Sequence, residues 1–164
     1  MERFAALLVS VLAALGPGAR QRTLWQADLQ IRSLTVSEDR GNLTARVVVV
    51  AEFGEALAAR VDMLLPVGVG IVTLGPGCVA GPSVGGIREL RARVECTLGN
   101  MPARSQRELY VVTTTPPSGV VRGFGAVAMS ETPDPKPGNN FAERAIPRDD
   151  WGEPSAKDFS PWIE

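Results

Sequence analysis

Two cysteines, Cys78 and Cys96, are the residues of this 164-residue chain whose type and spacing could do chemistry. They lie 18 positions apart, and the chain has no other cysteine. A thiol redox motif would need Cys-x-x-Cys spacing, and a metal site would need further ligands. We therefore favour a structural disulfide over buried free thiols or a reactive pair.

Histidine is absent from the sequence. Its absence excludes Ser-His-Asp and Cys-His nucleophilic machinery, HExxH metal sites and an imidazole proton relay. The net charge is only -1, and no run of Lys and Arg forms the basic footprint of a nucleic-acid-binding protein. We expect a protein that is not an enzyme, with no catalytic residues, no cofactor, no bound metal and no nucleic-acid partner.

The first nineteen residues have the features of a signal peptide. Phe4 to Leu15 form an apolar run broken only by Ser10, and Gly, Pro and Ala follow up to Ala19. The run is too short for a transmembrane span, which takes about 20 residues, and it lacks the amphipathic period of a surface helix in a cytosolic domain. We predict that residues 1–19 direct export, to a secreted, periplasmic or cell-surface location where a cysteine pair tends to close.

Short segments with strand patterns fill the chain from residue 27 to about residue 130, separated by Gly, Pro and Asn turns. The seven segments span residues 27–34, 43–53, 58–65, 67–74, 87–98, 108–115 and 120–130. In the first, Leu29 and Ile31 fall on one face and Asp28 on the opposite, polar face.

The third segment alternates in the same way, with Val61 and Met63 pointing inward and Arg60 outward. Pro66 ends this segment because it has no N–H for a ladder hydrogen bond. No segment has the pattern of a long helix. Seven short strands with regular turn signals predict an all-β protein with a β-sandwich over residues 27–147.

Four motifs in a fixed order resemble a family of extracellular repeats. The motifs are Ala27-Asp28-Leu29, then Ala59 to Val69 with its Leu-Pro-x-Gly-Val ending, then the cysteine pair with Val94 to Met101, and finally Glu131 to Asn140. Over residues 27–146 the chain is similar to the repeats called domain of unknown function 11, relatives of the bacterial cell-adhesion-related (CARDB-like) domains. The resemblance implies an immunoglobulin-like sandwich of about seven strands, used outside the cell as a stalk, spacer or adhesion module. It carries over no catalytic residues.

Two features depart from that family. Glu52-Phe53-Gly54-Glu55 stands where the family has an Asn-x-Gly turn, and the chain holds one copy where the family has several in tandem. In the last motif, Asp134 and nearby carboxylates such as Glu131 could hold Ca²⁺, but a rigid Pro-rich turn explains the same residues, and we favour the turn.

Residues 148–164 form an acidic, aromatic C-terminal tail. Residues 149–164 carry five acids and one lysine, or -4, whereas residues 20–148 carry 15 basic and 12 acidic side chains, or +3. Three of the nine aromatic residues of the chain, Trp151, Phe159 and Trp162, lie in this tail. Either the tail folds back over the sandwich or these three residues dock a partner; a tail without a role is the third alternative.

These observations predict a non-catalytic, secreted or cell-surface module for structure or interaction. Its partner would be another envelope or surface protein, or a second copy of the chain. The alternative is an accessory subunit or small-ligand carrier of a cell-envelope complex, which docks through the tail.

Overall fold

The computed structural model describes residues 26–85, 90–116 and 123–146. The predicted signal peptide, residues 1–19, and the tail, residues 148–164, lie outside these ranges. The described residues form nine strands and one 3₁₀ turn: β1 (Asp28–Asp39), β2 (Asn42–Phe53), β3 (Ala56–Leu64), β4 (Ile71–Leu74), β5 (Cys78–Val84), β6 (Arg91–Met101), β7 (Ser105–Thr114), β8 (Phe124–Met129), η1 (Pro137–Asn139) and β9 (Phe141–Arg144).

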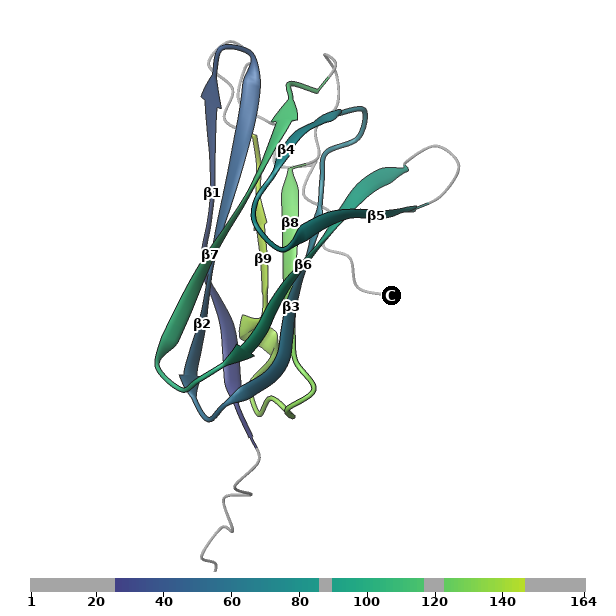
Figure 1. Cartoon of the computed structure of the whole chain (residues 1–164). Helices are drawn as coiled ribbons and strands as arrows, with labels where there is room; N and C mark the ends of the chain where they lie inside the picture. Colours follow the sequence, from purple (N-terminus) through teal and green to yellow (C-terminus); the bar gives the residue numbers. More distant parts are fainter. Residues whose placement is uncertain (1–25, 86–89, 117–122, 147–164) are drawn as a thin grey trace, which may run out of the picture.

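The strands make two antiparallel sheets that face each other (Figure 1). One sheet has the order β1-β2-β7-β4, and the other has the order β5-β6-β3-β8-β9. The first order matches strands A, B, E and D of an immunoglobulin sandwich, and β3-β8-β9 matches C, F and G. The predicted all-β sandwich is therefore confirmed, with the hairpin of β5 and β6 added beside β3.

The structure has more strands than the seven predicted. The prediction missed β5, in which Gly81 and Pro82 interrupt the strand pattern, and β9, which has only four residues and follows a Pro-rich turn. Gly and Pro are poor strand residues in isolation, and Pro is confined to edges or bulges. Both missed strands lie at the two edges of the five-stranded sheet.

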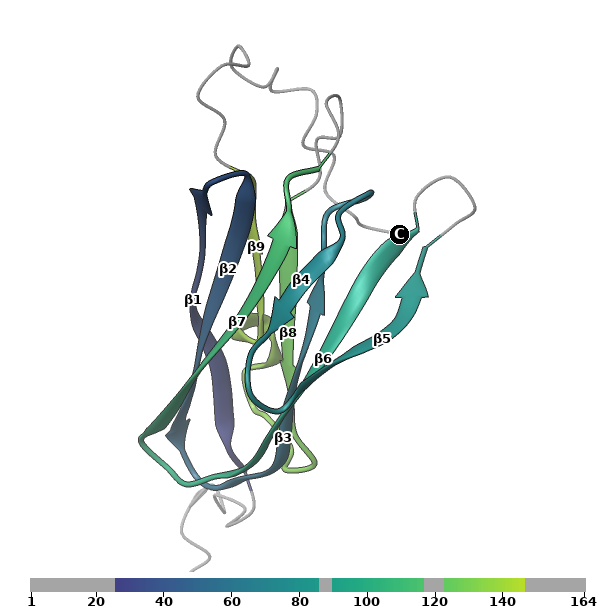
Figure 2. The ribbon, with the colours of Figure 1, turned by 45° about the horizontal axis from the view of Figure 1, so that its top comes forward.

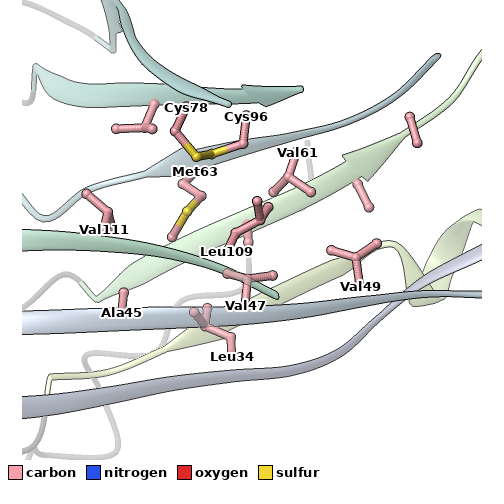
Figure 3. Close-up of a cluster of buried hydrophobic side chains, with 14 of the residues drawn as sticks. Leu34, Ala45, Val47, Val49, Val61, Met63, Cys78, Cys96, Leu109 and Val111 are labelled. Carbon is pink, nitrogen blue, oxygen red and sulfur yellow. A yellow bond between two sulfur atoms is a disulfide. The ribbon is translucent and has the colours of Figure 1, made fainter. Parts of the chain in front are cut away.

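Alternating side chains of the facing sheets form one core. Val61 and Met63 of β3 are fully buried, and Arg60 is exposed, so the predicted register of this strand is confirmed. Figure 3 shows both side chains pointing toward β2, where Val47 and Val49 are also fully buried. Complete burial of each such side chain contributes about 1.5–3 kcal/mol.

The β1 strand departs from simple alternation. Its pairing with β2 shifts between Asp28 and Leu29 and again between Ile31 and Ser33. Each shift moves the following side chains relative to the partner strand. Asp28 was predicted on the solvated face, but this prediction is wrong, because Asp28 is only 2% exposed.

The turn from β2 to β3 depends on Gly54. Its φ of +68° lies in the left-handed region, and a Cβ at this position would collide with the carbonyl oxygen of Gln26. This turn lies in the loop where the sequence departs from the family pattern. Only glycine meets both demands, a positive φ and a close backbone approach.

Candidate interaction surface

The predicted disulfide between Cys78 and Cys96 is present. The two residues lie directly opposite each other on β5 and β6, with Cα atoms 3.9 Å apart. The N–H of Thr97 donates to the carbonyl of Gly77, which makes the cysteines a non-hydrogen-bonded pair, the closer of the two pair types. The bond thus fastens edge strand β5 to its neighbour within one sheet.

The disulfide is buried against the core. Cys78 is 9% exposed and Cys96 is 1% exposed, and Figure 3 shows the sulfur atoms next to Met63. Burial among apolar side chains limits attack by external thiols. The geometry supports a structural disulfide rather than a reactive pair.

The turn from Asp134 to Asn140 is bound to the beginning of β1. The Asp28 carboxylate accepts hydrogen bonds from Nζ of Lys136 and Nδ2 of Asn139, each at 2.8 Å. The Asp134 carboxylate accepts from the backbone N–H groups of Leu29, at 2.9 Å, and Lys136, at 2.7 Å. Because both oxygens of Asp134 accept hydrogen bonds within the fold, these residues act as the rigid turn that the sequence favoured.

Opposing influences set the pKa of Asp28. Burial raises the pKa of this carboxyl, but hydrogen bonds from Lys136 and Asn139 and attraction to the Lys136 ammonium lower it, and the net pKa lies below the ordinary value of 3.8. The hydrogen bond to Asp28 and its negative charge raise the pKa of Lys136 above 10.5. Both residues are therefore charged at neutral pH.

The outer face of the four-stranded sheet is solvated. Nη1 of Arg46 lies 2.8 Å from Oε1 of Glu108, and its guanidinium lies 5.9 Å from the centre of the Tyr110 ring. The valines on this face are separated by polar neighbours: Val48 pairs with Ser33 and Glu108, and Val112 pairs with Thr44 and Thr73. This face has the composition expected of a sheet in contact with water.

The outer face of the five-stranded sheet carries a group of partly exposed apolar side chains. Val61, Met63, Phe124 and Ala126 point into the core, so the alternate positions on β3 and β8 point outward. Val127 pairs with Phe141 of β9, and Met129 lies two residues further along β8. Leu64 pairs with Gly125. A Cβ added at Gly125 would lie 3.7 Å from the Cβ of Leu64, so Leu64 borders the space above this glycine. We call Leu64, Val127, Met129 and Phe141 the apolar patch.

Exposure distinguishes this patch from the core. Phe141 is 55% exposed, and the other three members are partly exposed. The patch lies over β3, β8 and β9, whereas the β5–β6 end of the same sheet extends away from β1 and β2 in both views (Figure 1 and Figure 2). Exposed apolar side chains that gather on one sheet face can mark an interaction site.

Charged side chains border the patch on the side of β6. Nη2 of Arg93 lies 2.6 Å from Oδ2 of Asp62 and 3.2 Å from Oε1 of Glu95. Nη2 of Arg60 lies 3.9 Å from the sulfur of Met129, and no carboxylate of the described residues forms an ion pair with Arg60. Asp62 also pairs with Val127, and Glu143 of β9 pairs with Gly125, so charged side chains stand among the members of the patch as well as beside it.

The predicted partner-docking residues and the apolar patch are different sets. Trp151, Phe159 and Trp162 lie outside the described residues, so their role stays a prediction. The sequence prediction missed all four members of the patch. One signal was available in Phe124–Met129, because Phe-Gly-Ala-Val-Ala-Met is apolar on both faces, which a strand with one solvated face is not.

No family model matches this chain, and no curated protein matches it. The resemblance to the extracellular repeats therefore stays a prediction. Across the ranges that the structure describes, the chain has no helix with the length and apolarity that crossing a bilayer requires.

Proposed function

We propose that this protein is a non-catalytic structural and interaction module, exported from the cytosol, that binds another envelope or surface protein through the apolar patch. The observation that carries the proposal is the contrast between the two outer faces. Val127 lies between Phe141 on β9 and Asp62 on β3, whereas both cross-strand partners of Val48 and of Val112 on the other face are polar. A partner of matching chemistry would present apolar or aromatic side chains to the patch and acidic groups to Arg60.

The proposed compartment is supported by the disulfide and by the sequence of residues 1–19. Disulfides persist mainly in secreted, periplasmic and surface proteins. Intact-mass analysis of the protein recovered from its native cells tests this part of the proposal. We expect the loss of roughly twenty N-terminal residues and an oxidised cysteine pair; an intact Met1 on protein from the cytosol would contradict export.

Crosslinking on intact cells tests the proposed surface. A photo-reactive amino acid in place of Phe141 should give a discrete crosslinked product. The matched control is the same group at Val72, which is 51% exposed on β4 of the opposite sheet. A product at both positions, or at neither, would overturn the proposed surface, while a product with the mass of two chains would identify a second copy as the partner.

A further inference from the structure

We propose that the C-terminal tail, residues 148–164, covers the apolar patch in cis when no partner is bound. This inference rests on the proposed function, because it assumes that a partner binds the apolar patch. A partner that binds the patch must then displace the tail.

The position of the tail in the chain favours this occupant. Phe141 belongs to β9, the last strand, and the described chain ends at Ile146, five residues later. Eighteen residues follow, which span up to roughly 60 Å when fully extended. The described chain thus ends just after β9, an edge strand of the sheet that carries the patch, and the remaining residues are long enough to reach the patch.

The chemistry of the tail complements the patch. Trp151, Phe159 and Trp162 offer large apolar rings, and aromatic rings pack well on Phe141 and on the thioether of Met129. The tail also carries five carboxylates, and Arg60 beside Met129 has no carboxylate partner among the described residues. The aromatic rings of the tail therefore have apolar counterparts on this face, and Arg60 is a counterpart for one of its carboxylates.

Tethering favours the tail of the same chain over a second copy. A segment joined by a short linker acts at an effective concentration in the millimolar range, whereas a second copy must bind from solution. Cover in cis also removes exposed apolar area from water without dimerisation.

Tryptophan fluorescence tests the inference, because the three tryptophans are Trp25, Trp151 and Trp162. In the mature full chain with Trp25→Phe, all tryptophan emission comes from the tail. We expect this emission to be blue-shifted, and several-fold less quenched by acrylamide, than that of a synthetic peptide of residues 147–164. Both differences should be independent of protein concentration.

Variants of the patch locate the tail. Phe141→Ser and Arg60→Glu, each in the Trp25→Phe chain, should shift the emission toward that of the peptide, and Val72→Ser on the opposite sheet should not. Far-ultraviolet circular dichroism confirms that each variant is folded.

Peptide-like emission in the folded parent chain would overturn the inference while leaving the crosslinking result at Phe141, and with it the proposed function, intact. Protection that appears only at high concentration would assign the patch to a second copy. Protection unchanged by both patch variants would place the tail elsewhere. Either result would overturn the cover in cis.

Discussion

The ammonium nitrogen of Lys136 lies 2.8 Å from the carboxylate of Asp28, although 108 residues separate them in the chain. The contact joins the first strand to the turn that precedes the last strand. Asp28 is 2% exposed, whereas the Lys136 side chain is 66% exposed. Burial of the charged carboxylate is thus compensated by partners from the far end of the domain.

This relationship predicts a pH-dependent part of the stability. Because the pKa of Asp28 is lowered in the folded protein, its contribution is fully present above the ordinary value of 3.8 and is lost as the pH falls through the folded pKa. Denaturant unfolding of the parent and of Asp28→Asn should show a difference in free energy that is constant near neutral pH and shrinks in acid below pH 3.8. A difference that grows in acid, or does not depend on pH, would contradict this assignment.

The register of β3 gives a second prediction. Val61 is fully buried and pairs with Cys96 and Ala128, so Val61→Asp places an unpaired charge in the core and should lower the unfolding free energy by more than about 4 kcal/mol. Arg60→Asp on the exposed face should change the unfolding free energy by less than about 1 kcal/mol. Denaturant unfolding measures both; equal damage would mean that the register is wrong.

The third prediction concerns the disulfide. It closes a loop across 18 positions, and the chain-entropy model gives about 3 kcal/mol for a loop of this order. The double variant Cys78→Ala with Cys96→Ala should lose about 2–4 kcal/mol and keep its sheet content in circular dichroism. Because β5 is an edge strand, amide hydrogen exchange should accelerate first in β5, and uniform acceleration in both sheets would show that the bond supports more than this edge.

Two glycines provide a fourth, matched test. Gly54 and Gly41 both have positive φ, at +68° and +76°, but an added Cβ collides with the Gln26 carbonyl at Gly54 and meets nothing within 4 Å at Gly41. Gly41→Ala should therefore cost only the backbone strain, about 1 kcal/mol. Gly54→Ala should lower the melting temperature clearly more, and equal shifts would show that the contact with Gln26 does not constrain this turn.

The sequence predicted the parts of the fold that local alternation determines. Val61 and Met63 were assigned inward correctly because a strand has a period of two. Asp28 was assigned wrongly because a register shift separates it from Leu29 and because Lys136 binds its carboxylate, neither of which the local pattern reveals. The edge strands β5 and β9 were missed because their pairing with a neighbour, rather than their own propensity, makes them strands.

The apolar patch could not be predicted from the chain alone. Leu64 and Phe141 lie far apart in the sequence and share a face only because β8 pairs with both β3 and β9. An exposed Leu or Phe is by itself ordinary at a protein surface. Only the topology shows that these side chains share one face of the sheet.

The affinity of the crosslinked partner for two matched variants decides whether the apolar patch is the binding surface. Val127→Asp introduces a charge in the apolar patch, and Val48→Asp introduces the same charge among polar neighbours on the outer face of the other sheet. With both variants shown to be folded, we expect Val127→Asp to weaken binding by roughly tenfold or more, which is about 1.4 kcal/mol, and Val48→Asp to leave the Kd nearly unchanged. An unchanged Kd for Val127→Asp, or an equal loss for the two variants, would contradict the claim that this face is the interaction surface.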